Sequence, residues 1–305
     1  VANGTATINA AGPLTNGTGS TLSVSGNVSF TGSTVTLGNQ AGDNLSFGSL
    51  TFNSAGAAII DLNNGTALSG ASSATSLTFT STGAITNAAS ASLNISADAM
   101  LTAPSIDLGN QASDAINFGT LNVTSSGAVN IAEDSSTQLV GTNTAASLTI
   151  ASTGALANAA GASITVTGLS NFGGTSVDLG NLAGDTFNVG SLGFTSTGAV
   201  NISEDSSTQL GGTSTAGSLT LTSPGAITSA AAASVNVTGA TTLTGTSIAI
   251  GNQASDIFNF GSLNFTATTG GATIEEDSSL DLTGANTAPG AIVLTSVDAV
   301  ATGQD

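Results

Sequence analysis

A 71-residue repeat constrains the fold of this chain more than any other feature. The segment LGNQAGD at residues 37–43 returns in similar form three times, and the four copies begin at Leu37, Leu108, Leu179 and Ile250. The steps between the copies are equal, with no drift. A long period that is kept this strictly is typical of a solenoid, in which each unit packs mainly against its neighbours.

Short strands with one buried face are predicted within each repeat. Apolar residues alternate with Thr or Asn in LTFT at 77–80, ITVT at 164–167, LTLT at 219–222 and VNVT at 235–238. Period two indicates a strand with one face in the core and the other in water, and Thr, Val, Ile and Phe favour strands. Gly and Asn interrupt these segments at short intervals and favour turns. The Ala-rich stretches at 88–91 and 229–233 lie between strand signals, so we expect tight corners or strands there rather than helices.

The spacing of similar strands predicts a parallel β-helix. Segments resembling the one at Leu192 recur at Leu219, Leu243 and Leu263, in three unequal steps that together fill one repeat. We therefore expect an all-β, right-handed parallel β-helix of about thirteen coils, with three coils in each 71-residue repeat. A single β-helix domain would span residues 1–305. The unequal steps argue against a β-propeller, whose blades are antiparallel and about 40–50 residues long.

The two ends of the chain do not resemble the capping units of a solenoid. The sequence begins with Val1 rather than Met and both ends lie inside the repeat register. A solenoid end exposes unpaired backbone groups, so natural arrays usually carry atypical caps. We expect either a segment of a longer repetitive protein or ends that stack on other copies of the chain, and the two readings are compatible.

The charge composition excludes several classes of function. The chain has 18 Asp and Glu residues and no Lys, Arg, His or Cys, which gives a net charge of −18. Nucleic-acid binding needs cations against phosphate, and a negative surface is repelled by anionic membranes. No apolar run approaches the ~20 residues of a membrane span. Because the absence of Lys and Arg also removes every trypsin-type cleavage site, we expect an extracellular or cell-surface location, without nucleic-acid partners or membrane insertion.

Repeated carboxylates are the candidates for metal ligands. One set follows the Gly-Asn turn, and a second set precedes Ser-Ser. The candidates are Asp43, Asp114, Asp185, Asp256, Glu133, Asp134, Glu204, Asp205, Glu275, Glu276 and Asp277. Carboxylates beside carbonyl oxygens on a turn are typical calcium ligands. However, the calcium-binding motif G-G-x-G-x-D is absent, and the first repeat has Leu62-Asn63 in place of the acids. We favour solvated turn acids that keep the protein soluble and expect no cofactor, with calcium as the alternative.

Other repeated positions are interpreted as structural. Asn follows Gly at Asn39, Asn110, Asn181 and Asn252, and Asn tolerates the left-handed conformation and bonds its own turn backbone. Two sets of Phe residues are predicted to lie in the core, because Val replaces Phe once in each set. The first set is Phe47, Phe118 and Phe260 with Val189, and the second is Phe52, Phe194 and Phe265 with Val123. Outward Thr suits a solvated strand, and the Thr stripe breaks at Ala151, which argues against an ice-binding face.

Catalysis is not expected from this composition. Without His, Cys, Lys or Arg, the chain lacks the usual bases that activate a nucleophile and the cationic side chains that bind a phosphate. Two carboxylates can hydrolyse a glycoside, but an active site is normally one asymmetric constellation, whereas these acids recur with the repeat. Ten Asn-x-Ser/Thr sequons, among them Asn16, Asn64, Asn94, Asn122 and Asn236, make glycans an alternative partner where a glycosylation system meets the chain.

Two segments carry a resemblance to a known family. LTFTSTGAITNAA from Leu77 and LTLTSPGAITSAA from Leu219 resemble repeats of filamentous haemagglutinin-like exoproteins. The resemblance is compositional and covers nearly the whole chain. It implies a right-handed β-helical shaft of a very large secreted bacterial protein that acts in surface adhesion or biofilm. The amino-terminal secretion module of that family, with its Asn-Pro-Asn-Gly signature, is not visible in the sequence, which agrees with a shaft segment.

Together these observations predict a non-catalytic structural component of an extracellular bacterial fibre or surface adhesin shaft. Its expected partners are other copies of the chain, stacked end to end, or the continuation of a longer chain. The alternative is a calcium- or carbohydrate-dependent binding module on the cell surface.

Overall fold

A computed structural model describes residues 4–111 and 113–302 of the chain. Val1, and Ala112 of the second repeated block, lie outside these residues. The chain divides into two compact units, residues 1–146 with 150–153 and residues 147–149 with 154–305. Both units have the same fold, so the division does not decide between one domain and two, and the single domain over residues 1–305 stays a prediction.

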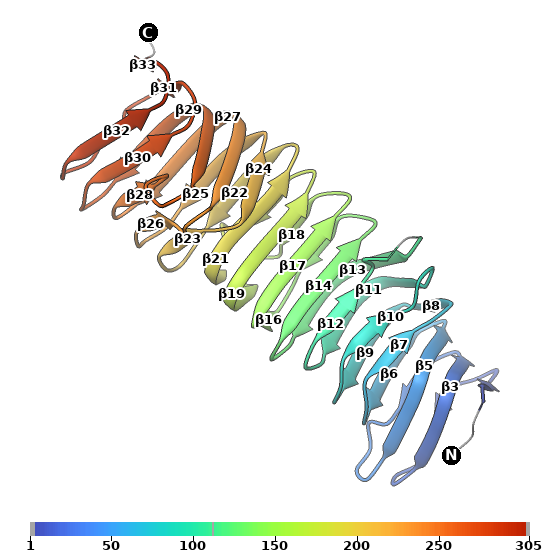
Figure 1. The fold of residues 1–305 in the computed structure, drawn as a ribbon. Coiled ribbons are helices and arrows are strands. Elements are labelled where there is room, and N and C mark those ends of the chain that lie inside the picture. The colour runs from blue at the N-terminus through green and yellow to red at the C-terminus, as the bar shows by residue number, and fades with distance from the viewer. Residues whose placement is uncertain (1–3, 112, 303–305) are drawn as a thin grey trace. The chain divides into compact units, whose positions relative to one another are not determined.

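Each unit consists of short parallel strands that stack coil upon coil (Figure 1). The described residues contain strands and turns but no helix, and the parallel β-solenoid of about thirteen coils is confirmed. No segment among them is therefore a helix of the length and hydropathy that crossing a bilayer requires.

The strands of the first unit are β1 (Ala6–Asn9), β2 (Leu14–Thr15), β3 (Thr21–Gly32), β4 (Val35–Leu37), β5 (Asn44–Ser54), β6 (Ala57–Leu62), β7 (Thr66–Leu68), β8 (Ala71–Ala74), β9 (Ser76–Ser81), β10 (Ile85–Asn87), β11 (Ser92–Thr102), β12 (Ile106–Leu108), β13 (Ala115–Thr124), β14 (Ala128–Glu133), β15 (Thr137–Leu139) and β16 (Thr142–Ala145). Strand β17 (Ser147–Ser152) has residues in both units. The strands of the second unit are β18 (Leu156–Asn158), β19 (Ser163–Gly174), β20 (Val177–Leu179), β21 (Thr186–Ser196), β22 (Ala199–Ser203), β23 (Thr208–Leu210), β24 (Thr213–Ala216), β25 (Ser218–Thr222), β26 (Ile227–Ser229), β27 (Ser234–Gly245), β28 (Ile248–Ile250), β29 (Ile257–Ala267), β30 (Ala272–Glu276), β31 (Leu280–Leu282), β32 (Ile292–Ser296) and β33 (Val300–Thr302).

Paired residues on neighbouring strands define the length of one coil. In the first unit Leu14 of β2 pairs with Val35 of β4, Val35 pairs with Ala58 of β6, and Ala58 pairs with Leu77 of β9. Three coils therefore lead from position 14 to position 77. The chain length of these three coils is eight residues less than the 71-residue repeat. One repeat thus contains three coils and about a third of a fourth, since a coil has about 21 residues here.

As a consequence, each repeat is rotated about the solenoid axis relative to the repeat before it, so that equivalent strands lie on adjacent strand faces. Strand β9 is the repeat equivalent of β1, yet its Leu77 continues the ladder that starts at β2. Strand β10 is the repeat equivalent of β2, yet its Asn87 lies on the ladder that runs from β1 through Val28, Leu50 and Leu68. Side chains one full repeat apart therefore do not stack on each other.

The second unit has the same register, which moves the coil boundaries relative to the sequence prediction. Leu192 pairs with Leu210 and not with Leu219, the residue that resembles it in sequence. Leu219 instead pairs with Thr241, which pairs with Leu263. The unequal steps from Leu192 through Leu219 and Leu243 mark similar local sequence, whereas the coils that stack on each other are set by these backbone pairings.

The alternation of buried and exposed residues follows the sequence prediction. Every second residue is buried in the predicted segments 77–80, 164–167, 219–222 and 235–238, and the predicted Phe and Val positions are at most 5 % exposed. The Ala-rich stretches form tight turns, in which Ser90 and Ala232 have φ angles of 61° and 60°. The core of each unit is accordingly a narrow column of Leu, Ile, Val and Phe between three strand faces.

Candidate functional site

The turn aspartates connect successive coils. In the third repeat, Oδ2 of Asp185 accepts hydrogen bonds from the backbone N–H of Leu182 (2.8 Å) and from Nδ2 of Asn158 (2.7 Å). Its Oδ1 accepts a bond from the N–H of Gly161 (2.9 Å). Asp185 therefore closes its own turn and holds the preceding coil at two points.

The asparagine partner forms hydrogen bonds to the backbone as well as to the aspartate. Asn158 is 3 % exposed. Its Oδ1 accepts the N–H of Gly180 (2.8 Å), and its Nδ2 donates to the carbonyl oxygen of Ala159 (3.0 Å) as well as to Asp185. We call this pair an Asn–Asp clasp, because it satisfies polar groups of two coils at once.

The clasp recurs in every repeat with a constant separation of 27 residues between its members. The pairs are Asn16–Asp43, Asn87–Asp114 and Asn158–Asp185, with Ser229–Asp256 in the fourth repeat. In each pair the side-chain contact is 2.7 Å. The hydrogen bond from Asn16 is the main cause that lowers the pKa of Asp43. The Asn members were not predicted from the sequence, although their fixed spacing from the aspartates was a usable signal.

The acidic pairs before Ser-Ser bond to strand backbone that has no neighbouring strand on the side of the following coil. Oε1 of Glu204 accepts the N–H of Val189 (2.7 Å), and Oδ2 of Asp205 accepts the N–H of Phe187 (2.7 Å). Strand β21 pairs with the following strands β23 and β24 only at Leu192 and Thr195. The two carboxylates thus take the place of ladder partners along the first half of β21.

The same arrangement occurs in the other repeats. Glu133–Asp134 bonds to Phe118 (2.9 Å) and Ile116 (2.8 Å), Glu276–Asp277 bonds to Phe260 (2.8 Å) and Phe258 (2.9 Å), and in the first repeat Asn64 and Asn63 bond to Phe47 (3.2 Å) and Leu45 (2.9 Å). The fourth repeat has one residue inserted before the acidic pair. Glu276 rather than Glu275 is therefore the equivalent of Glu133 and Glu204. Glu275 is exposed.

The interpretation of these acids as solvated is therefore wrong for Glu133, Glu204 and Glu276, and also for Asp256, which is 8 % exposed. Glu133, Glu204 and Glu276 are 1–2 % exposed, whereas Asp134, Asp205 and Asp277 are exposed. Burial raises the pKa of Glu204 and of Glu276. Hydrogen bonds from Val189, Ser206 and Thr208 to Glu204 act in the opposite direction. With no Lys, Arg or His in the chain, hydrogen bonds alone compensate these buried carboxylates.

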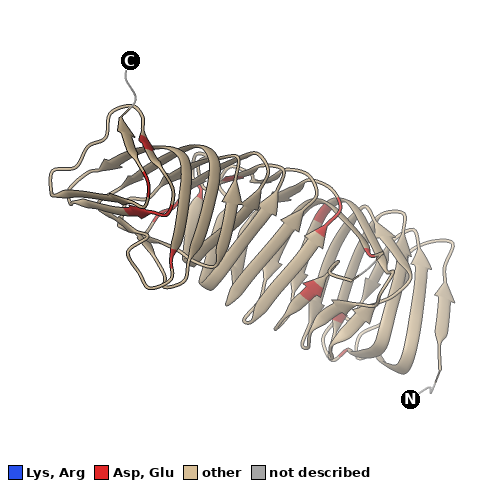
Figure 2. Cartoon of the chain, turned by 45° about the horizontal axis from the view of Figure 1, so that its top comes forward, with Lys and Arg blue, Asp and Glu red and all other residues tan. Residues whose placement is uncertain are grey.

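The calcium hypothesis stays a prediction. Across residues 4–111 and 113–302, no three acidic side chains gather into a group that could hold a metal ion. Figure 2 shows the acidic residues as separate segments along the ribbon. Equivalent acids are at least 71 residues apart in the sequence, which is more than three coils, so they do not lie on neighbouring coils. Hydrogen bonds to the chain occupy oxygens of the candidate carboxylates in both sets.

The asparagines that follow Gly lie in exposed turns, as expected for Asn39, Asn110, Asn181 and Asn252. The left-handed conformation belongs to the glycine before each of them, with φ between 74° and 79°, and not to the asparagine. At Gly180 a Cβ atom would lie 2.1 Å from the carbonyl oxygen of Ser203, so close approach of two coils also requires glycine. Asn110 and Asn181 donate to the side chains of Asp107 and Asp178.

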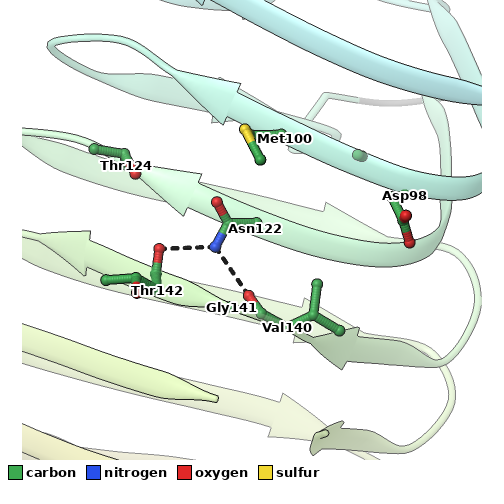
Figure 3. Close-up of a pocket in the computed structure, with 8 residues that line it drawn as sticks. Asp98, Met100, Asn122, Thr124, Val140, Gly141 and Thr142 are labelled. Atoms are coloured by element: carbon green, nitrogen blue, oxygen red, sulfur yellow. Dashed lines mark hydrogen bonds between the residues drawn. The ribbon is translucent and has the colours of Figure 1, made fainter. Parts of the chain in front are cut away.

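A groove of about 400 Å³ lies open on the surface of the first unit. Its lining residues are Asp98, Ala99, Met100, Asn122, Thr124, Val140, Gly141 and Thr142. Nδ2 of Asn122 donates to the carbonyl oxygens of Val140 (2.9 Å) and Thr142 (2.7 Å), as Figure 3 shows. This groove was not predictable from the sequence, because its residues come from three coils and no motif links them.

Comparison with known proteins gives one match. A family model described as repeats of unknown function (DUF5649) matches residues 197–259. No curated protein and no solved structure matches the chain. The match and the fold agree in describing a repeat β-helical protein.

Proposed function

We propose that this chain is a non-catalytic structural segment of an extracellular bacterial fibre or surface adhesin shaft, of the filamentous haemagglutinin-like kind that its sequence resembles. The observation that carries the proposal is how the repeated polar side chains are used. Asn158, Asp185, Glu204 and Asp205 all bond to the chain itself and join one coil to the next. Residues repeated for this purpose support a load-bearing coil stack rather than a reaction centre.

The partners that we propose are further β-coils, supplied by another copy of the chain or by a longer chain. In the second unit, Ile292 of β32 and Val300 of β33 are 46 % and 51 % exposed, although they follow Ala272 and Leu280 of the core in the ladder. Apolar side chains in a core position favour coverage by another coil. Glycans are the alternative partner.

A seamless deletion on the producing cell tests the proposal. Removal of residues 37–107 joins Thr36 to Leu108 and keeps the repeat register, because Thr36 and Asp107 are repeat equivalents. The matched control removes residues 37–72, about half a repeat. Immunogold electron microscopy should show labelled surface fibres for the parent chain and the seamless deletion, and a loss of fibres for the control. Labelling confined to the cell interior, or loss of fibres in the seamless deletion, would contradict the proposal.

The second candidate is a calcium- or carbohydrate-dependent binding module. It is favoured by the exposed carboxylates of Asp134, Asp205 and Asp277, which recur at one repeat position. This candidate predicts that calcium, but not an equal concentration of magnesium, raises the melting temperature. Equal melting curves in calcium, magnesium and chelator would exclude its calcium-dependent form.

A further inference from the structure

The groove at Met100 departs from the repeat. Asp98 occupies a position filled by Asn27, Leu169 and Ala240 in the other repeats, and Met100 one filled by Ser29, Asn171 and Thr242. Met100 is also the only Met in the chain, and it is 47 % exposed. Three other repeats form the same coils without this pair, so the fold does not require it. A constellation found in one repeat is where a specific ligand is expected.

Two side chains of the groove, Asp98 and Asn122, offer oxygens that accept hydrogen bonds, whereas the hydroxyl groups of Thr124 and Thr142 can donate or accept. Asn122 uses its Nδ2 group on two carbonyl oxygens, which leaves its Oδ1 on the side of Met100 (Figure 3). Asp98 is exposed, and one of its carboxylate oxygens accepts the hydroxyl of Thr120 (2.7 Å). Its other oxygen, together with Oδ1 of Asn122, offers lone pairs to a donor. A ligand that matches this lining brings N–H groups and a positive charge.

The rest of the lining specifies an aliphatic stem. Met100 and Val140 supply the apolar surface, and the thioether of Met adapts to flexible chains. The chain contains no cation of its own to neutralise Asp98. We infer that the groove binds a lysine side chain of a partner protein, whose four-carbon stem lies on Met100 and Val140 and whose ammonium group faces Asp98.

Lysine fits this groove better than arginine does. A compact ammonium group donates three hydrogen bonds in different directions and can therefore bond to the remaining oxygen of Asp98 alone. A guanidinium group prefers both oxygens of one carboxylate in a plane, but Thr120 already bonds to one oxygen of Asp98. Because the groove is open, one lysine should bind with a dissociation constant of about 1–10 mM. A partner with several lysines would bind more tightly through multivalency.

The single Met supplies a direct probe of the groove. Protein labelled with ¹³C in the Met methyl group gives one methyl resonance, from Met100. The full chain is titrated with the peptide acetyl-Gly-Lys-Gly-amide, with the same peptide acetylated on the lysine, and with its arginine counterpart. The test variant is Asp98→Asn, which keeps an acceptor for Thr120. The control variant is Asp298→Asn, which removes an equal charge from an exposed position in the second unit.

The lysine peptide should shift the Met100 resonance in a saturable manner that weakens with salt. The acetylated peptide should not do so, and the arginine peptide should bind more weakly. Asp98→Asn should raise the dissociation constant about two- to fivefold, the range of an exposed ion pair, and Asp298→Asn should leave it unchanged. No saturable shift with the lysine peptide, an equal shift with the acetylated peptide, or equal affinities of the two variants would overturn the inference. The proposed structural role does not depend on this result.

Discussion

Replacement of Asn158 by Ala should open one Asn–Asp clasp without unfolding the other coils. The variant leaves the N–H of Gly180 without its acceptor, and Asp185 loses a donor. The unsatisfied N–H of half-buried Gly180 costs up to about 3 kcal/mol, and the lost bond to a half-buried carboxylate adds about 1 kcal/mol. The expected local loss of stability is therefore up to about 4 kcal/mol. Asn158→Ser should cost about 1 kcal/mol or less, since Ser229 makes the corresponding two contacts in the fourth repeat.

Amide hydrogen exchange measures this effect where it arises. A solenoid opens locally, so the exchange rate of the Gly180 amide should rise by up to about 900-fold in Asn158→Ala, which is the rate equivalent of that energy. The Gly38 amide, which belongs to the clasp of Asn16, serves as an internal control and should exchange as in the parent chain. An unchanged Gly180 amide, or a Ser variant as damaged as the Ala variant, would refute the role of the clasp.

Three further predictions concern single side chains. Glu204→Gln should raise stability at neutral pH. Burial raises the folded-state pKa of Glu204, so the folded state favours the protonated carboxyl. The stability that comes with this protonation is present in acid and is lost as pH rises from the ordinary Glu range through the raised pKa. Melting temperatures of parent and variant should therefore converge in acid, and curves that stay parallel at all pH values would contradict this. Ala232→Gly should stabilise the protein by about 0.5–1 kcal/mol in urea unfolding, because Ala232 has a φ of 60° and the equivalent positions in two other repeats are Gly19 and Gly161. The control Ala231→Gly should not stabilise it. Leu219→Asp places a charge in the core, where Leu219 is 1 % exposed, and should destabilise by about 3–5 kcal/mol, and an unchanged melting curve would show that the side chain does not point inward.

The sequence predicted the strands and the class of fold because both depend on local patterns. Alternation in residues 77–80 and 219–222 specifies a half-buried strand, and the repeat specifies a solenoid. The register of the coils was not predictable in the same way. Leu192 and Leu219 have similar neighbours, yet Leu192 stacks on Leu210. Segments of similar sequence indicate an equivalent local environment, whereas the stacking of one coil on the next depends on the number of residues in each coil.

The candidate site was predicted in part for a related reason. The sequence marked Asp185 and Glu204 as repeated acids, but a repeated acid can be solvated, bound to a metal or bonded to the backbone. The burial of Glu204 follows from the absence of a ladder partner for Val189 on the following coil, which only the strand pairing shows. Asn158 was overlooked because Asn is frequent in the chain, although its distance of 27 residues from Asp185 is the same in every repeat.

Electron microscopy of the native material, at a resolution that shows single coils, distinguishes a fibre of stacked coils from isolated particles. A structural fibre built from these coils should be a long filament with an axial spacing of about 4.8 Å. Each 71-residue repeat should advance by about 16 Å and turn by about a third of a revolution, because it contains three coils and about a third of a fourth. Filaments without the spacing of about 4.8 Å, a repeat of about 14 Å without rotation, or only isolated short particles would contradict the account.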